Sequence, residues 1–600
     1  MPTSSPAAAR DRPPDNTYSS RRLPLAALGV GLVAIFLHLA SLGWGFFWDD
    51  FFHQAVLRDL VPEADFHKWS LFDFDLSRTA PGHTHAIFRP WWTDGDFKAR
   101  FFRPVTSLTL WLDHVLFGDW APGYHVTNLL IFALVVVAAW RLYRALPISP
   151  RAALFALALF AWDDVHAVPV GWVANRNSIL ALLFTLLTVH AARRYLAHPS
   201  PVWLAGAVMA QVLAFGSKES GIVAFPLAFA YMMCCGDVHG PAATPQRVAR
   251  SPLTWMLGAA ALLMLVGYIA GGYGARSLMY VSPWDDPLAL LLRVLTMLPL
   301  GLLSLVLGVP PDLAVLQPWI GPAMLAAAGV IVPLAAWTWL KVVGWSRVAT
   351  FASAWVVLSL IVEVGGDVSN RLLGSASFGA ALLLGLLLDR VLELPRRWRH
   401  TPAFALASLV FLTGGVLGPG LAPFLAGGLA RFAAGDREVV RSLPLADEST
   451  VGVLLNARSG LQAILGTATW RCLHDADRGL LVPLTAGRRE LTWLRDSETT
   501  MVLTSRSVPL LEAHLERLFR TRRAAPSVGA RYDAGLFEAE VLSADDAGLR
   551  SVRFRFPFSL DDQRYRFLSY DGETIVQLTP PAVGRSLEIS EPPAPFPGAP

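Results

Sequence analysis

The chain has 600 residues, of which 54% are hydrophobic and only 16% are charged, and its mean hydropathy is +0.45. These values exclude a soluble globular protein, and the length exceeds that of a single domain. The formal net charge of +4 does not indicate nucleic-acid binding, because the arginines cluster at the ends of apolar runs. That distribution is typical of orientation in a membrane.

The first 22 residues predict a disordered, basic tail on the cytoplasmic side. They are rich in Pro, Ser and Ala and carry Arg10, Arg12, Arg21 and Arg22. The apolar run from Leu23 to Leu42 follows. A signal peptide is the alternative interpretation, but this run is longer than an ordinary signal-peptide core, and further apolar runs follow it. We therefore expect a retained first transmembrane helix.

A long polar insert, 44–120, follows this helix and is expected on the outer side of the membrane. It opens with Trp48-Asp49-Asp50 inside a group of aromatic residues. Aromatic side chains favour the headgroup level of a bilayer, and carboxylates there are costly unless they have a partner or a function. Later in the insert, Phe101 to Phe117 has the pattern of an amphipathic helix at the interface.

Apolar runs then recur at lengths that suit a bilayer core of about 30 Å. They lie near 125–140, 152–168, 178–192, 202–216, 221–235, 253–272, 288–309, 321–340, 348–362, 372–389 and 403–428. All basic clusters fall in the cytoplasm only if one run does not cross, and the proline-flanked run 288–309 is the candidate for a re-entrant or interfacial helix. The sequence thus predicts a polytopic α-helical membrane domain, 23–430, with roughly eleven crossings.

The composition changes from about residue 436, where charge rises and alternating patterns appear. Ser551–Phe556 and Thr574–Leu578 are predicted strands, and Pro509–Thr521 has the spacing of a helix. We expect a small soluble α+β domain, 436–590, on the outer side, and a Pro-rich tail, 591–600. Cys234, Cys235 and Cys472 support neither a disulfide framework nor a metal site.

A set of polar residues lies at the predicted outer ends of the apolar runs. It consists of Asp49, Asp50, Arg103, His125, Asn128, His166, Arg176, Asn177, Lys218, Glu219, Asn370 and Arg371. Each one alone has a structural explanation, such as capping a turn, packing, or extending to the headgroups. Several cations facing a pair of carboxylates on one membrane face instead indicate a site.

One reaction needs this combination of groups. Transfer of a sugar from a lipid-linked phosphate to a hydroxyl requires a base near the acceptor and cations around the departing phosphate. The phosphate leaves without a proton, so one carboxylate can suffice, whereas glycoside hydrolysis uses two carboxyl groups that flank the bond. Base assistance contributes about 10²–10⁴ in rate, and stabilisation of the leaving charge is often the larger effect.

Several motifs in order resemble the bacterial protein-O-mannosyltransferase-like enzymes of the GT-C class, which includes related eukaryotic proteins with TPR repeats. The motifs are Trp48-Asp49-Asp50, Phe102-Arg103-Pro104, Gly123-Tyr124-His125 with Asn128, Gly171-Trp172 with Asn175-Arg176, Ser217-Lys218-Glu219-Ser220, and Asn370-Arg371 with Ser377 and Gly379. The resemblance covers roughly residues 24–400. It implies a membrane glycosyltransferase that uses a polyprenyl-phosphate sugar.

The resemblance also implies roles for individual residues. The catalytic aspartate of the family corresponds to Asp49, with Asp50 beside it. The residues corresponding to the family's other polar positions, which we expect to bind the donor and its phosphate, are Arg103, His125, Asn128, Arg176, Lys218, Glu219 and Arg371. The chain departs from the family pattern at Val168, Asn370, Leu372 and Gly374, and no TPR array follows.

We expect an inverting transferase, possessing Asp49 as the general base, that moves a sugar such as mannose to a protein or glycan hydroxyl. The expected location is the inner membrane, with the C-terminal domain in the periplasm. No ligand spacing predicts a metal ion or another cofactor. Two alternatives stay open: a transporter or lipid flippase with a charged pathway, and a degenerate family member that binds a lipid-linked sugar without transferring it.

Overall fold

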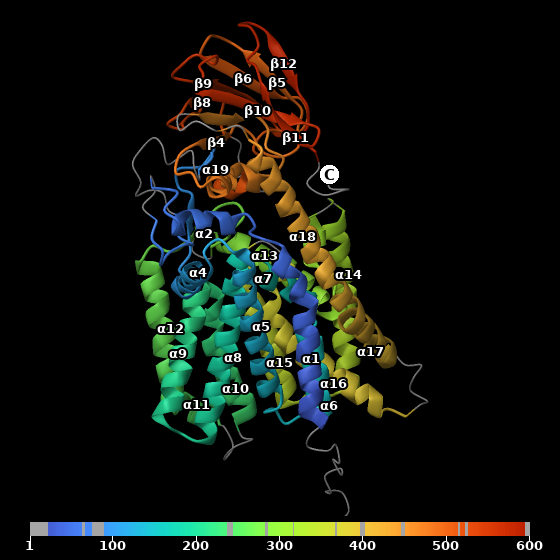
Figure 1. Ribbon diagram of the computed structural model, residues 1–600. Coiled ribbons are helices and arrows are strands. Elements are labelled where there is room, and N and C mark those ends of the chain that lie inside the picture. Colours follow the sequence, from blue (N-terminus) through green and yellow to red (C-terminus); the bar gives the residue numbers. More distant parts are fainter. Residues whose placement is uncertain are drawn as a thin grey trace, which may run out of the picture.

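The computed structural model describes residues 22–62, 66–74, 89–236, 244–282, 286–315, 317, 319–366, 369–395, 402–443, 445, 450–513, 516–521 and 526–593. Residues 1–21 of the predicted N-terminal tail and residues 594–600 of the Pro-rich C-terminal tail lie outside the described residues. Figure 1 shows a bundle of long helices with a sheet-containing domain at one end. We call this the domain end of the bundle and the opposite one the basic end.

The long helices of the bundle follow the apolar runs of the sequence. They are α1 (Arg22–His38), α5 (Ala121–Tyr143), α6 (Pro150–Ala161), α7 (Ala167–Gly171), α8 (Arg176–Ala197), α9 (Pro201–Ser217), α10 (Ala224–Cys235), α12 (Pro252–Ala270), α13 (Pro287–Leu307), α14 (Ile320–Val342), α15 (Arg347–Glu363), α16 (Gly374–Glu393), α17 (Pro402–Leu412) and α18 (Gly418–Arg441). Within the described residues, 8 helices are long and apolar enough to cross a membrane, or up to 9 with the bent pair α6–α7. A polytopic helical membrane protein is thereby confirmed.

Helix α13 begins and ends at the domain end, although its length and composition would allow it to cross a membrane. Near its start, Arg293 donates hydrogen bonds to the carbonyl oxygens of Gly365 and Gly366 at 3.2 and 2.8 Å. Just beyond its end, the carboxylate of Asp312 accepts the backbone N–H of Asn370 at 2.7 Å. Both ends therefore contact the same connection between α15 and α16. This agrees with the prediction of one apolar helix that does not cross.

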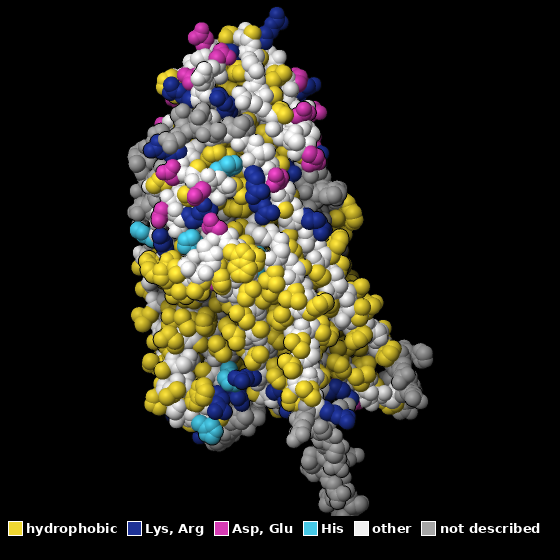
Figure 2. Space-filling view, in the orientation of Figure 1, with side chains coloured by type: hydrophobic (Ala, Val, Ile, Leu, Met, Phe, Trp, Pro, Cys, Tyr) yellow, Lys and Arg dark blue, Asp and Glu magenta, His cyan; other side chains and the backbone are white. Residues whose placement is uncertain are grey.

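Figure 2 shows a broad band of hydrophobic side chains across one face of the bundle, with Lys, Arg and His side chains below it at the basic end. Many of the bundle's large apolar side chains are exposed, among them Leu28, Leu130 and Leu263. A continuous exposed apolar band is expected where lipid replaces water. The interior of the bundle is a separate core in which Trp355, Phe378 and Tyr143 are fully buried.

The polar insert after the first helix contains two short helices at the domain end. They are α2 (Asp49–Leu57) and α4 (Pro104–Phe117), and the second matches the helix predicted between Phe101 and Phe117. The strand β1 (Lys98–Arg100) of this insert pairs antiparallel with β2 (Gly274–Arg276), which follows α12. The insert is thus joined to the segment that follows α12.

The C-terminal domain has two sheets and one main helix. The strands are β3 (Val451–Leu454), β4 (Leu480–Pro483), β5 (Leu491–Arg495), β6 (Thr500–Ser505), β7 (Arg531–Asp533), β8 (Glu538–Asp545), β9 (Gly548–Arg555), β10 (Tyr565–Asp571), β11 (Thr574–Leu578) and β12 (Ser586–Ile589). One sheet has the order β11-β10-β3-β4, and the other has the order β12-β5-β6-β9-β8-β7. Because β3 and β4 are parallel, they need a crossover, which α19 (Gly460–His474) supplies.

The two predicted strands are present as β9 and β11, but the helix predicted over Pro509–Thr521 is wrong. Among the described residues of this segment, only the short 3-10 helix Glu516–Phe519 forms. Leu510 instead makes an isolated bridge with Leu549, and Leu511 has a φ of 65°, which is incompatible with a continuous α-helix. The leucines that suggested a helical face include the buried Leu510 and Leu511, which belong to the core of the sheets.

The C-terminal domain packs directly on α2. Helix α19 lies against it: Cys472 donates to the carbonyl oxygen of Phe51 at 3.2 Å, and Arg471 donates to that of Leu60 at 2.9 Å. Two tryptophans of the polar insert also enter the core of the domain, where the indole N–H of Trp91 donates to Leu484 at 2.8 Å and that of Trp92 to Glu516 at 3.2 Å. The domain therefore holds the segment that carries Asp49.

Candidate active site

The chain enters α2 through a strained turn that places Asp49 at the first residue of the helix. Gly45 has a φ of 74°, and Trp48 has a φ of 28°, which is rare for a residue with a side chain. Trp48 is held there by a hydrogen bond from its indole to Asp436 at 3.2 Å and by edge contact with Trp172. Strain of this kind persists where the surrounding structure fixes it, and it is common at functional sites.

The two adjacent carboxylates have different environments. Asp50 is buried, and its oxygens accept the backbone N–H of Phe47 at 2.9 Å and that of Ala174 at 2.6 Å. Asp49 is half-buried, and in the part of the chain that the structure describes it accepts no hydrogen bond. Asp50 thus anchors α2 to the Gly171–Arg176 segment, whereas the carboxylate of Asp49 is available to another group.

Burial raises the pKa of Asp49 to about 6, against the opposing charges of Arg371 and Arg103. The pKa of Asp50 is raised well above its ordinary value, first by burial and further by the charge of Asp49, although its two backbone hydrogen bonds oppose this. Asp49 is therefore a carboxylate that changes its protonation state near neutral pH, as a general base should.

Three cations from separate parts of the chain form a group, and two of them lie close to Asp49. Arg103 precedes α4, Lys218 follows α9, and Arg371 lies in the short helix Asn370–Leu372 before α16. The charges of Arg371 and Arg103 act on Asp49. Both arginines also lie close enough to Lys218 for their charges to act on it. Folding thus brings together four of the residues singled out in the sequence.

Two of these cations are paired with carboxylates. Arg103 donates from Nε and Nη2 to one oxygen of Glu219, at 3.1 Å each. Lys218 contacts both oxygens of Glu363, at 2.8 and 3.0 Å. Both pairs are mostly shielded from solvent, so neither charge stands uncompensated.

Arg371 differs from the other two cations. Among the described residues it forms no ion pair, and its guanidinium lies over the ring of Trp172 at 5.3 Å. Asn370 holds this segment, since its side chain donates to Asp164 at 2.9 Å and its backbone N–H donates to Asp312 at 2.7 Å. Trp172 therefore contacts both Trp48, which precedes Asp49, and Arg371. Of the three cations, Arg371 is the one that has no carboxylate partner in the described chain.

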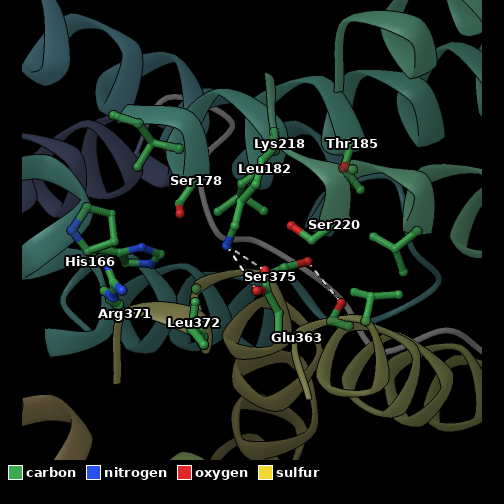
Figure 3. A pocket seen from close by; sticks show the side chains of 18 residues that line it. His166, Ser178, Leu182, Thr185, Lys218, Ser220, Glu363, Arg371, Leu372 and Ser375 are labelled. Carbon is green, nitrogen blue, oxygen red and sulfur yellow. Dashed lines mark hydrogen bonds and ion pairs between the residues drawn. The ribbon is translucent and has the colours of Figure 1, made fainter. Parts of the chain in front are cut away.

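A small cavity of about 30 Å³ adjoins these cations. Figure 3 shows Lys218 and Glu363 meeting across it, with Arg371 and His166 to one side. Ser178, Ser220 and other small polar side chains complete the lining. The cavity connects the segments that carry Lys218 and Arg371, although the two lie far apart in the sequence.

Arg176, His125 and Asn128 lie deeper and form a hydrogen-bonded support. Arg176 is fully buried, is bonded to Asn128 at 2.5 Å, and forms an ion pair with Asp113 at 2.5 Å. It also donates to the carbonyl oxygen of Tyr124 at 2.9 Å. His125 contacts the carbonyl oxygen of Gly45 at 3.0 Å, where the chain turns into α2. These contacts favour a structural role for the three residues.

Replacing Arg176 by glutamine is expected to destabilise the folded protein by about 3–5 kcal/mol, because Asp113 would remain buried and unpaired. The measurement is the thermal unfolding temperature and the yield of purified protein. A variant that folds normally and loses only activity would contradict this structural role.

Tyr280 is a site residue that the sequence did not reveal. It lies in the irregular connection between β2 and α13 and contacts Phe101, with ring centroids 5.7 Å apart. Burial raises the pKa of its phenol, against the opposing charges of Arg371 and Arg103. The charges of Asp49 and Glu219 act on it as well. A neutral hydroxyl is thus placed among the charged groups of the site.

Metal binding finds no support in the described residues, which contain no group of three or more His, Cys, Asp or Glu side chains placed to hold an ion. The charges of the site are instead those of its own arginines, lysine and carboxylates.

Comparison with known proteins yields distant relatives of one kind. The chain is 26% identical over 288 residues to protein O-mannosyl-transferase F38B6.6 of Caenorhabditis elegans, covering 47% of this chain and 36% of that protein. It is 27% identical over 213 residues to protein O-mannosyl-transferase tmtc2 of Xenopus laevis, covering 34% of this chain and 24% of that protein. The chain resembles the protein O-mannosyl-transferases. It spans about a third or less of the length of these relatives, and no family model matches it.

Two solved structures align with this chain at low similarity. One is the Archaeoglobus fulgidus oligosaccharyltransferase tethered with an acceptor peptide, with 13% identity, a TM-score of 0.42, and coverage of 78% of this chain and 64% of that one. The other is ArnT from Cupriavidus metallidurans bound to undecaprenyl phosphate, with 14% identity, a TM-score of 0.40, and coverage of 77% and 86%.

Proposed function

We propose that this protein is a membrane glycosyltransferase that moves a sugar, with mannose as the first candidate, from a polyprenyl phosphate to an acceptor hydroxyl. The observation that carries the proposal is the placement of Asp49. Its carboxylate accepts no hydrogen bond from the described chain, and the charges of Arg371 and Arg103 act on it. The resemblance to the protein O-mannosyl-transferases supports the same reaction class.

Asp49 is the general base in this proposal. It takes the proton from the acceptor hydroxyl as the hydroxyl oxygen attacks the anomeric carbon, and the bond from that carbon to the phosphate oxygen breaks. Attack from the side opposite the phosphate inverts the anomeric configuration. Asp50 does not exchange this proton, because both its oxygens are held by backbone N–H groups. It fixes the direction in which α2 presents Asp49.

The leaving polyprenyl phosphate needs positive charge as its bond to the sugar breaks. Arg371 is the first candidate, because no carboxylate in the described chain neutralises it and because a guanidinium can form two parallel hydrogen bonds to a phosphate. Lys218 and Arg103 add charge nearby, while Glu363 and Glu219 fix their side chains. Arg176 has no part in this step, since its donors are engaged elsewhere.

The orientation in the membrane follows from the arginines at the basic end. Arg141 and Arg144 end α5, and Arg193 and Arg194 lie in the last turns of α8. Connections rich in arginine stay in the cytoplasm. Asp49 and the C-terminal domain, at the opposite end, then face the periplasm in an inner membrane, where the lipid carrier presents its sugar.

The C-terminal domain is proposed to orient the acceptor, a protein or a glycan. It packs on α2 next to Asp49 through α19, so an acceptor held by the domain would lie close to the base. Removal of residues 436–600 would also remove the contacts that support α2. A truncated protein that kept full activity and acceptor choice would contradict both roles.

The function is tested by incubating the purified protein with polyprenyl-phosphate mannose and measuring released polyprenyl phosphate. The Asp49→Asn variant is the control for release that does not depend on the proposed base. Release that depends on Asp49 supports the transferase. Movement of the intact lipid across a vesicle membrane without release would indicate a flippase, and binding without release would indicate a degenerate family member.

The pH dependence of transfer should show a single acid limb near pH 6. Asp49 must be deprotonated to act as a base, and its pKa is raised to about 6 by burial, with Arg371 and Arg103 opposing. Activity is therefore expected to be nearly full above pH 7 and to fall as the pH drops through about 6. The measurement is kcat/KM against pH, which reports the free enzyme. An acid limb near pH 4, where an ordinary aspartate titrates, would contradict the raised pKa of Asp49.

A further inference from the structure

A second cavity lies at the basic end of the bundle, opposite Asp49. It has a volume of about 800 Å³ and opens between the ends of α1, α5, α8 and α9. Four arginines line it, Arg141 and Arg144 from α5 and Arg193 and Arg194 from α8, together with His190. Figure 2 shows Lys, Arg and His side chains gathered at this end of the molecule, below the apolar band.

The cations of this cavity have no acidic partners in the described part of the chain. None of the four arginines there forms an ion pair, and two nitrogens, Nε of Arg193 and Nδ1 of His190, are buried without a hydrogen-bond partner. A nearby arginine shows the contrast, because Arg151 at the start of α6 pairs with Asp389 and with Glu393. Orientation in the membrane explains basic residues at this end, but it does not explain why they enclose a cavity without counter-charge.

Apolar and aromatic groups shape the same cavity. The guanidinium of Arg144 lies over Trp140 at 5.8 Å, and that of Arg194 lies over Trp203 at 5.0 Å. Such contacts hold a guanidinium while leaving its N–H groups free to bind an anion. Leu23, at the start of α1, adds an apolar wall. The cavity thus combines phosphate-binding donors with surfaces that suit hydrocarbon.

We propose that this cavity binds the phosphate headgroup of an anionic phospholipid from the leaflet at the basic end. Four guanidiniums in one cavity repel one another unless an anion lies between them, and arginine matches the geometry of phosphate oxygens. The lipid's first carbons lie against Trp140, Trp203 and Leu23. Basic cavities between transmembrane helices are suited to such headgroups. The site is independent of the proposed reaction, because it uses none of the residues around Asp49.

The test is a titration of the purified full-length protein in detergent with phosphatidylglycerol, followed by native mass spectrometry. The first variant, R193Q/R194Q, removes two half-buried guanidiniums. The second, R141Q/R144Q, removes two exposed ones at the rim and leaves the helix packing intact. The matched control, R250Q/K341Q, removes two exposed cations at the same end of the bundle outside the cavity.

We expect saturable phosphatidylglycerol binding that is roughly thirtyfold weaker in each cavity variant and unchanged in the control. Phosphatidylcholine, whose headgroup has no net charge, should bind weakly to all four proteins. Equal affinity in the wild type and R141Q/R144Q would overturn the proposal, and so would an equal loss in the control. Inorganic phosphate that displaces the lipid at equal concentration would assign the cavity to a soluble phosphate instead. Thermal unfolding of each variant shows that it is folded.

Discussion

Replacing Asp49 by asparagine is expected to lower the rate of sugar transfer by about 10²–10⁴ while the protein folds and inserts normally. Asparagine has nearly the same shape but cannot take a proton. The substitution leaves α2 unchanged, because the Asp49 carboxylate accepts no hydrogen bond from the described residues, whereas Asp50 carries the contacts to Phe47 and Ala174. The measurement is the release of polyprenyl phosphate under single-turnover conditions, which separates chemistry from binding and product release.

Asp59→Asn provides the matched control. Asp59 lies two residues beyond the end of α2, and its carboxylate pairs with Lys68 at 3.3 Å on the surface. Its φ of 56° is a conformation that asparagine also tolerates. The same chemical change there should leave transfer unaltered. If the two variants lose activity equally, the loss at Asp49 reflects structure and Asp49 is not the base.

The helical part of the fold could be predicted from sequence because membrane helices obey strong local rules. Each apolar run must match the bilayer, and basic residues mark the side on which connections stay. Even α13 could be singled out. Pro287 and Pro310 flank its apolar run, and all basic clusters fall on the cytoplasmic side only if one run does not cross the membrane. The helix expected over Pro509–Thr521 failed because Leu510 and Leu511 are buried in the core of the sheets, where helical spacing is not required.

The sequence could propose which residues form the candidate site but not what each of them does. Motif order predicted that Asp49, Arg103, Lys218 and Arg371 belong together, and in the structure the charges of Arg371 and Arg103 act on both Asp49 and Lys218. The sequence could not separate Arg176 from Arg371, because both are arginines at helix starts near the same membrane face. Burial and partners separate them: Arg176 is fully enclosed with Asp113, whereas Arg371 lies over Trp172 and has no ion-pair partner among the described residues.

Tyr280 and Glu363 were missed for a different reason. Neither lies in a motif: Glu363 is the last residue of α15, and Tyr280 lies between β2 and α13. Their significance comes from contacts that only folding creates, such as the pairing of Glu363 with Lys218 across 145 positions of sequence. The packing of the C-terminal domain on α2 is likewise invisible in the local pattern.

Arg371→Gln should impair transfer in two separable ways. It removes the guanidinium proposed to hold the leaving phosphate, for which a loss of about 10²–10³ in kcat is typical when a transition-state donor is removed. It also removes a charge that lowers the pKa of Asp49, so the acid limb of the pH profile should move above pH 6. The variant is therefore weakest at low pH and recovers only partly as the pH rises.

The loss of kcat that remains at pH values above the shifted acid limb measures the role of Arg371 in holding the phosphate. Arg371→Lys keeps the charge but loses the paired donors, so it should restore the position of the limb more fully than it restores kcat. Arg390→Gln, at the other end of α16, is the control, because its guanidinium pairs with Glu393 on the surface. A normal kcat in Arg371→Gln, with only a shifted acid limb, would limit the role of Arg371 to lowering the pKa of Asp49. The phosphate would then have to be held by Lys218 or Arg103.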